Sequence, residues 1–589
     1  MNLLLLCPAT LEETGRALGV LASGLGPADR LVLLAREGIE VPATPAAVEI
    51  LRRPARAPGL AVLRLRRELA ARGFERIVVP LRGAPHAPAP VARILFFGSL
   101  PGAEVFLLAE GSPPARLRPA FLVREALRSV AFHVLDAAAR IVARLLVAAF
   151  SPPSPAGIRP SRRERRGGST FVLPVLPDLS HTFLYREVLA ILERSPAEDV
   201  VTLRRGEATT VHPEAGALLP RVRFAPRDGV VRRHLRVARR MLRSPARTAD
   251  LLALYARRPG GRAGDLLGRG PLEEADHPGN AFGLADLLER RGGGRIHVYG
   301  STYPANVAMG AAILLGLPFS VSAFEDFDFP YRFKLLEEKH RLARFFRVTT
   351  RASRERLASL LGVGEDARIH VVPWGMDPAG WGPVGPHPEG DVLFTACRLV
   401  EKKGLRHLVP ALARLRDRGI PARWAVAGDG PERAALETLV REGGLEERVE
   451  FLGALPSDRV RALLQRARIA VLPCVVARNG DRDGIPTFVL EAMLCGVPVV
   501  TTPISGIPEL VVEGETGFLA PPEDPEGLAA TLERVWRDPA RARAVAARGR
   551  DRAVRTQDVR ESARRLLDLL VSISPDGSGP GPEGVRAAG

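Results

Sequence analysis

Two clusters of charged residues, each downstream of an apolar run, could do chemistry in this 589-residue chain. In the first cluster, Arg398 and Lys403 follow the run at 392–397. A guanidinium and an ammonium group on a strand-to-helix loop suit a diphosphate, because fixed donors and the helix dipole both favour negative charge. Only four lysines occur in the chain, and two of them stand at 402 and 403. Binding of a compact lysine ammonium group to phosphate would explain that placement. The alternative is that the two lysines lie at the solvated start of a helix.

The second cluster is acidic. Asp483 lies on a loop after the apolar run 469–472, and Glu491 lies eight positions further on, in a predicted helix. Unpaired charge is costly to bury, so neither carboxylate is expected to be an ordinary core residue. Both are candidate acceptors for the hydroxyl groups of a sugar-like ligand. Pro486 and Thr487 begin the helix, since the first helical turn tolerates a residue without an N–H.

Glycine-bearing loops accompany these clusters. Gly428 and Gly430 follow the apolar run 424–427, at the same predicted sheet edge as the charged clusters. The signal is weak alone, because glycine-rich turns are common in α/β folds. Gly506 opens a later loop that could approach a ligand closely or simply turn.

The elements that must position these residues are parallel strands with connecting helices. Strand, loop, helix and strand follow one another from 469 to 501, and parallel sheets bind ligands at the carboxyl ends of their strands. The same alternation predicts α/β domains at 1–115, 169–385 and 386–573. The last two are called the middle domain and the C-terminal domain below.

Three further segments lie outside these domains. Residues 116–150 are apolar, but their charges would each cost at least ~2.5 kcal/mol inside a bilayer. They predict an amphipathic helix, docked on protein or lying in a membrane interface. Residues 151–168 predict a basic linker, and residues 574–589 a disordered tail. The chain start has no basic residues and predicts a strand instead of a signal peptide.

The amino-acid composition limits the classes of partner that this chain is expected to bind. The net charge is +18, and 84 − 4 = 80 of the basic residues are arginine. No basic patch is interleaved with aromatic residues, which argues against a nucleic-acid partner and leaves an anionic membrane surface as the more economical one. The four cysteines have no metal or disulfide spacing, so we expect a reducing compartment and no metal.

Residues 391–570 resemble the C-terminal, nucleotide-sugar-binding domain of the retaining glycosyltransferases of family four. Those enzymes have the GT-B fold, two Rossmann-like, doubly wound domains facing a cleft. The resemblance implies that Arg398 and Lys403 hold the donor diphosphate and that Glu491 binds ribose. Asp483 stands where the first acid of the family's E-x7-E pattern contacts the donor sugar, and the run DGIPTFVLEAM resembles a subgroup with aspartate there.

The middle domain resembles the family's acceptor-side half more loosely. LPDLSHTFLYREV is similar to its opening helix and RIHVYGSTYPANVAM to a middle strand, which makes Ser180 and His297 acceptor-side candidates. On the alternative view His181 and His297 are ordinary turn residues. Phe324 stands where the family often has a histidine at the reaction centre. Candidates to take over the role of that histidine are His297 and the acids beyond the strand at 319–323. If none of them does, the alternative is a weak or inactive enzyme. Those acids are Glu325, Asp326 and Asp328.

The fold class implied is α/β of the GT-B type, with an added N-terminal Rossmann-like α/β domain outside the match. The function implied is metal-independent, retaining transfer of a sugar from a nucleotide sugar to a glycan or lipid-linked acceptor. Neither a cofactor nor a nucleic acid takes part. The expected setting is surface-polysaccharide or glycoconjugate biosynthesis in the cytoplasm, at the inner membrane face where the basic surface meets anionic lipid. A GT-B nucleotide-sugar epimerase and a non-catalytic scaffold are the alternatives.

Overall fold

The computed structural model divides the chain into two compact units, residues 1–139 and 140–589. In the first unit it describes the strands. In the second it describes residue 158 and the ranges 168–178, 181–206, 213–226, 230–256, 277–292, 294–323, 335–382 and 390–572. The predicted disordered tail lies outside the described residues, as do all of the predicted amphipathic helix except Arg116 and all but two residues of the predicted linker.

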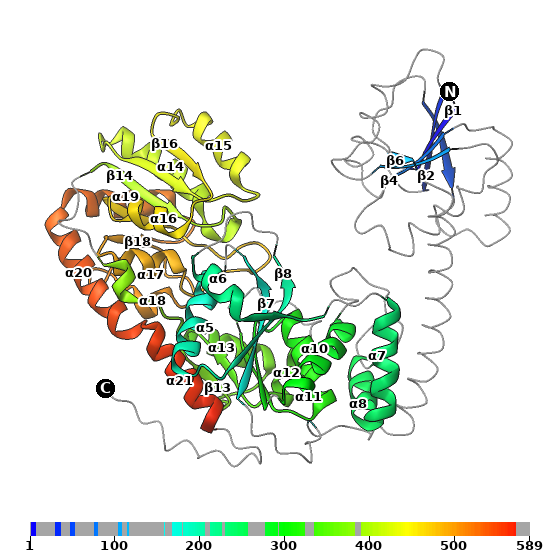
Figure 1. Cartoon of the computed structure of the whole chain (residues 1–589). Helices are drawn as coiled ribbons and strands as arrows, with labels where there is room; N and C mark the ends of the chain where they lie inside the picture. Colours follow the sequence, from blue (N-terminus) through cyan, green and yellow to red (C-terminus); the bar gives the residue numbers. More distant parts are fainter. Residues whose placement is uncertain are drawn as a thin grey trace. The chain divides into compact units, whose positions relative to one another are not determined.

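The first unit contains a sheet of order β3-β2-β1-β4-β5-β6, shown in blue in Figure 1. All strands run parallel except β6. The apolar runs predicted the first five strands, and the structure confirms them. The bounds are β1 Asn2–Leu6, β2 Arg30–Arg36, β3 Val48–Arg53, β4 Arg76–Pro80, β5 Glu104–Leu108 and β6 Ala115–Arg116.

The middle domain is built on seven parallel strands in the order β13-β12-β11-β10-β7-β8-β9. The chain changes direction across the sheet between β7 and β10, so the loops after these strands open onto a switch point. The strands are β7 Ser169–Leu176, β8 Asp199–Arg205, β9 Val222–Phe224, β10 Arg295–Tyr299, β11 Phe319–Ser322, β12 Phe346–Val348 and β13 Ile369–Val371. The helices are α5 Thr182–Arg194, α6 Pro213–Leu218, α7 Val230–Arg243, α8 Pro245–Ala256, α10 His277–Arg291, α11 Tyr303–Leu315, α12 Leu336–Leu342 and α13 Arg351–Leu361.

The C-terminal domain has six parallel strands in the order β16-β15-β14-β17-β18-β19. Its switch point lies between β14 and β17. Together the two sheets confirm the predicted pair of doubly wound domains. The strands are β14 Val392–Ala396, β15 Arg423–Ala427, β16 Val449–Gly453, β17 Ile469–Leu472, β18 Val499–Thr501 and β19 Phe518–Leu519. The helices are α14 Leu405–Asp417, α15 Arg433–Glu442, α16 Ser457–Leu464, α17 Thr487–Leu494, α18 Ile507–Leu510, α19 Pro525–Arg537, α20 Pro539–Thr556 and α21 Val559–Ser572.

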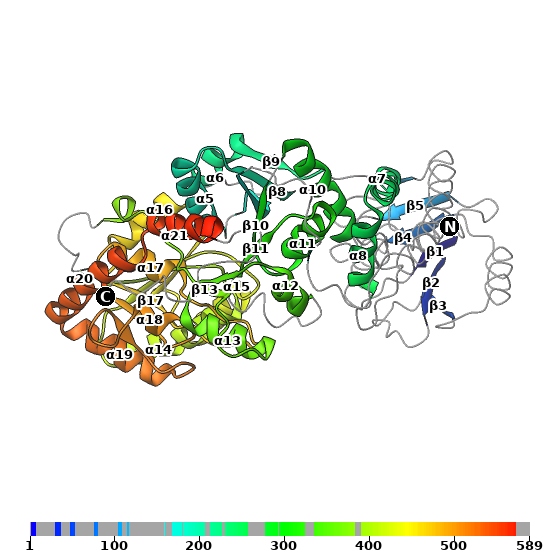
Figure 2. The same ribbon diagram turned by 90° about the horizontal axis from the view of Figure 1, so that it is seen from below.

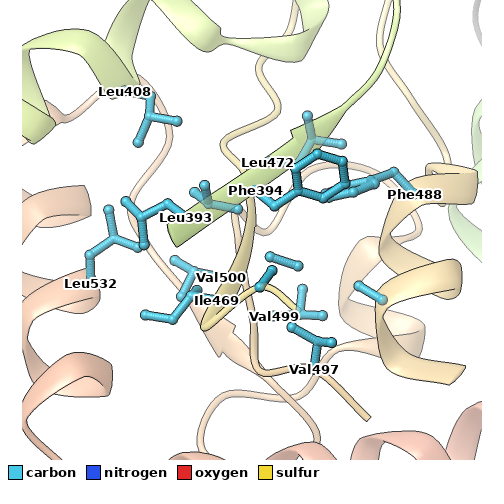
Figure 3. Close-up of a cluster of buried hydrophobic side chains, with 14 of the residues drawn as sticks. Leu393, Phe394, Leu408, Ile469, Leu472, Phe488, Val497, Val499, Val500 and Leu532 are labelled. Atoms are coloured by element: carbon cyan, nitrogen blue, oxygen red, sulfur yellow. The ribbon is translucent and has the colours of Figure 1, made fainter. Parts of the chain in front are cut away.

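Helix α17 is apolar on nearly every side, so it packs deep in the C-terminal core. Figure 3 shows Phe488 of α17 beside Phe394 of β14, and their ring centroids lie 5.9 Å apart in an edge-to-face arrangement. Gly496, at φ +70°, ends the helix in the left-handed conformation that suits glycine. The packing of Phe488 against β14 therefore fixes the position of the neighbouring turn, which carries Glu491.

The last helix, α21, packs on the middle domain although its sequence follows the C-terminal domain. Val559, Ala563 and Leu566 are buried with α5 residues in one apolar cluster. The two views in Figure 1 and Figure 2 both place α21 beside α5. The predicted C-terminal domain, 386–573, includes this helix, because an amphipathic pattern does not tell which core receives it. No helix within the described ranges is both long and apolar enough to cross a lipid bilayer.

A fully buried ion pair joins α5 to the middle sheet. Arg347 of β12 donates two hydrogen bonds to the Glu187 carboxylate, at 2.8 and 3.0 Å, and both side chains are 0% exposed. The Tyr299 hydroxyl also donates to Glu187, at 2.8 Å. The Arg347 guanidinium lies 3.9 Å from the centre of the Trp374 ring. This network holds α5 in a single position over the sheet.

We predict that Glu187→Ala lowers the free energy of unfolding by about 3–5 kcal/mol, because it leaves the Arg347 charge buried without an opposite charge. The matched control is Asp391→Ala, which removes a surface ion pair whose side chains are 41% and 59% exposed. That control is expected to cost at most ~1 kcal/mol. Urea unfolding measures both, and equal small losses would contradict the role given to the buried pair.

Candidate active site

Three loops meet at the carboxyl ends of β14, β15 and β17. The Leu399 N–H donates to the Asp429 carbonyl at 2.9 Å, which joins the first two loops. A Cβ on Gly428, which has φ +139°, would lie 1.8 Å from the Cys397 carbonyl oxygen. Only glycine fits there, because both the space and the backbone angle exclude a side chain.

The first and third loops also touch. A Cβ on Gly404, at φ +64°, would lie 1.9 Å from the Pro473 carbonyl oxygen. The Val475 N–H donates to the Lys402 carbonyl at 2.9 Å. This close approach places the predicted cationic loop directly against the predicted acidic loop, at the switch point of the sheet.

Asp483 is held by two ammonium groups. The Lys403 Nζ donates to its Oδ2 at 2.6 Å, and the Lys402 Nζ lies 3.4 Å from its Oδ1. Lys402 also donates to Asp481 at 3.0 Å. Burial by itself raises the pKa of the Asp483 carboxyl, but the two lysines outweigh burial and hold that pKa below its usual range. Asp483 is therefore charged at neutral pH.

Lys403 keeps its positive charge because Asp483 lies beside it. Burial favours the neutral amine, yet the Asp483 carboxylate raises the pKa of Lys403 above its ordinary value. The Lys403 and Asp483 side chains are each 13% exposed, so their attraction is weakly screened by solvent.

Arg398 lies on the same loop as Lys403, directly after β14, and is exposed. Its charge reaches the start of α5 in the middle domain. Burial lowers the pKa of His181, Asp178 opposes that change, and Arg398 lowers it further. The His181 Nδ1 lies 3.5 Å from Asp178. The positive charge of Arg398 therefore acts on a histidine of the other domain.

Glu491 faces the middle domain as well. Its Oε1 lies 3.5 Å from Nη1 of Arg186, and the two side chains are 11% and 8% exposed. Burial raises the pKa of the Glu491 carboxyl, and the Arg186 charge works in the opposite direction. The Arg186 Nε donates to Glu214 at 2.9 Å, and its guanidinium lies 5.5 Å from the centre of the Trp381 ring.

Helix α5 thus borders both ends of the site. The charge of Arg398 lowers the pKa of His181, the N-cap of this helix. Arg186, further along the helix, contacts Glu491. Lys403 and Asp483 therefore meet within the C-terminal domain, and Glu491 lies against the middle domain.

The remaining predicted residues of the C-terminal domain have more varied positions. Pro486 is the N-cap of α17 and Thr487 is its first residue. A Cβ on Gly430 would lie 2.4 Å from the Leu399 carbonyl oxygen, so this glycine allows two loops to pack. Gly506 faces Thr350 of the middle domain, where a Cβ would come within 2.3 Å of the methyl group. The loop at Gly506 therefore does more than turn, since it contacts the other domain.

His297 lies in the core, within β10, so the view of it as a turn residue is wrong. Its two ring nitrogens lie 2.8 and 2.9 Å from the Ser320 and Ser322 hydroxyls. Burial, with a smaller effect of Arg347, lowers the pKa of His297 to about 3, so the ring is neutral. The other predicted acceptor-side residues lie outside the described residues. They are Ser180, Phe324, Glu325, Asp326 and Asp328.

Sequence reasoning missed Arg186 and Glu214. One signal was present, because Arg186 and Glu187 are adjacent charges in a helix whose neighbouring positions are mostly apolar. Such charges need partners when the helix packs on both sides. Within the ranges that the structure describes, no three His, Cys, Asp or Glu side chains lie together in a way that could hold a metal ion.

Comparison with known proteins places this site in a family. Residues 390–538 match the family described as "Glycosyl transferases group 1". The chain is 37% identical to the putative colanic acid biosynthesis glycosyltransferase WcaL of Salmonella typhimurium over 182 residues, which are 31% of this chain and 45% of that protein. It is 30% identical to the 2-deoxystreptamine glucosyltransferase of Streptomyces kanamyceticus over 292 residues, which are 45% of this chain and 72% of that protein.

The fold also matches a solved structure, that of Anabaena Alr3699/HepE in complex with UDP and glucose. The TM-score is 0.52, the sequence identity is 18%, and the match covers 69% of this chain and 100% of that chain. At this identity the likeness shows the fold alone.

We predict that Lys403→Met and Asp483→Asn each destabilise the C-terminal domain, because each leaves a partly buried charge with a weaker set of partners. The double variant should lose less than the sum of the two, with a coupling energy of about 1–3 kcal/mol. Thermal unfolding of the four proteins measures this coupling. Simple additivity would contradict a direct Lys403–Asp483 interaction.

Proposed function

Because this chain belongs to the GT-B glycosyltransferases, we propose that it transfers a sugar from a nucleoside diphosphate to a glycan or lipid-linked acceptor. The single observation that carries the proposal is the junction of two neighbouring loops, in which Lys403, on the loop that also carries Arg398, contacts Asp483, on the loop that leads into the helix of Glu491. An activated sugar has a matching distribution of groups. Its diphosphate is anionic, and its ribose and its sugar ring carry hydroxyl groups.

The cations act on the leaving group. As the bond from the sugar to the diphosphate breaks, negative charge grows on the diphosphate. Arg398 and Lys403 stabilise that charge with fixed donors, the electrostatic contribution that is usually the largest in catalysis. Lys403 must share its ammonium group between Asp483 and phosphate when the donor binds. Lys402 keeps Asp483 and Asp481 in place meanwhile, since it contacts both.

The carboxylates hold the two sugars of the donor. In this proposal Glu491 accepts from the ribose hydroxyls and Asp483 from the hydroxyls of the transferred sugar. Retention of configuration and membership of family four rest on the resemblance of the motif residues. Closure of the two domains excludes water and so favours transfer over hydrolysis. No metal is required in this scheme, because the protein's own cations meet the diphosphate charge.

The proposed setting is the synthesis of a cell-surface polysaccharide or glycoconjugate. A relative named for colanic acid biosynthesis supports it. The formal charge of +18 supports contact with the anionic inner face of the cell membrane, where a lipid-linked acceptor would lie.

The first test is turnover. Purified protein is incubated with a panel of nucleoside diphosphate sugars and with glycan or lipid-linked acceptors, and nucleoside diphosphate release is followed. We expect release that depends on the acceptor. Conversion to an isomeric nucleotide sugar would instead identify an epimerase, and binding without turnover a scaffold.

The second test is donor binding. We predict that Lys403→Ala and Glu491→Ala each weaken the affinity for the best-bound of UDP, GDP and ADP by about tenfold or more, since each removes a charged hydrogen-bond partner. Arg423→Ala is the matched control, because Arg423 is the first residue of β15, at the opposite edge of the sheet. Calorimetry measures the affinities. Unchanged affinity in both site variants would refute the site assignment.

A further inference from the structure

A buried cluster at the seam between the middle and C-terminal domains contains polar atoms without hydrogen-bond partners. Arg186 is 8% exposed, yet neither Nη1 nor Nη2 has a hydrogen-bond partner among the residues that the structure describes. Oε2 of Glu214 also has no hydrogen-bond partner among the described residues. Unpaired polar atoms are unusual in a protein interior, because burial removes the water that would otherwise satisfy them.

The atoms of this cluster define what could satisfy them. The Arg186 guanidinium offers only N–H donors, and the Glu491 carboxylate offers only acceptors. The two groups lie 3.5 Å apart, which is an ion-pair contact and not a short hydrogen bond. A hydroxyl group both accepts and donates, so it can receive an N–H from Arg186 and donate to Glu491.

Two neighbouring hydroxyls fit better than one. The terminal nitrogens of a guanidinium form a rigid fork, and a carboxylate presents two oxygens, so each group can contact both hydroxyls of a cis-diol. The Trp381 ring lies on one side of the guanidinium, 5.5 Å from it, and Glu214 holds the Nε atom. Both contacts fix the direction in which the fork points.

Resting on the proposed function, in which Glu491 binds the donor ribose, we propose that Arg186 is a second ribose ligand supplied by the middle domain. Its free N–H groups donate to the ribose 2′- and 3′-oxygens while the hydroxyls donate to Glu491. The pair makes the site selective for ribonucleotides over 2′-deoxyribonucleotides.

The arrangement also links donor binding to the position of the domains. Arg186 belongs to α5 of the middle domain and Glu491 to α17 of the C-terminal domain. The buried Glu187–Arg347 pair holds α5 on its sheet, so Arg186 cannot follow the ribose independently of its domain. A ribose that contacts both side chains therefore holds the two domains together.

The test compares a ribonucleotide with its 2′-deoxy counterpart. UDP, GDP and ADP are first ranked by calorimetry on the full chain, and the tightest is then compared with its 2′-deoxy form. In the unmodified protein we expect the deoxy form to bind about tenfold or more weakly, because it leaves charged groups without a partner. In Arg186→Met we expect the ribonucleotide to lose about tenfold, and the ratio between the two forms to fall to a few-fold.

Two further variants serve as controls. Arg194→Met, in the last turn of α5 and exposed, should keep both affinities. Arg186→Lys keeps the charge but loses the fork, so its ratio should also fall, and this comparison replaces Arg186→Met if that variant fails to fold.

The outcomes separate the inference from the proposed function. If Arg186→Met weakens both nucleotides equally, or lowers only the unfolding temperature, Arg186 is an interdomain tie and the inference is overturned. If Lys403→Ala and Glu491→Ala also leave nucleotide affinity unchanged, the donor site itself is absent and the proposed function fails with it.

Discussion

A carboxylate held between two ammonium groups is the interaction on which the site depends. Asp483 contacts both Lys402 and Lys403, and these contacts bring the loop after β17 against the loop after β14. The arrangement needs the switch point of the sheet, because only there do the carboxyl ends of neighbouring strands open apart. It also needs Gly404, whose missing side chain lets the two backbones approach.

The second requirement is a neighbour that reaches both ends of the site. Helix α5 meets it, because the charge of Arg398 acts on His181 and Arg186 lies against Glu491. Its own position is set by the Glu187–Arg347 pair and by the apolar cluster it shares with α21. Packing on the other side of α5 thus helps to decide where Arg186 meets the C-terminal domain. The proposed chemistry of the site, a cation for a diphosphate and a carboxylate for hydroxyls, depends on that placement.

Much of this arrangement could be predicted from the sequence, for a local reason. Short apolar runs bounded by turn residues identify buried parallel strands, and a charged residue just after such a run must lie at the carboxyl edge of a sheet. Arg398 follows that rule directly, and Lys403 and Asp483 lie further along the loops that leave the same edge. The contacts of Arg186 do not follow the rule, since they depend on how two domains meet. The position of His297 was missed because its partners, Ser320 and Ser322, come from a neighbouring strand.

The most direct test of the proposed donor site is a crystal structure of the chain with its tightest-binding nucleoside diphosphate. The account predicts the diphosphate within hydrogen-bond distance of Arg398 and Lys403, and the ribose on Glu491, in one continuous density. A nucleotide bound elsewhere would contradict it. So would a nucleotide whose diphosphate lies on Arg398 and Lys403 while its ribose lies away from Glu491, or the reverse.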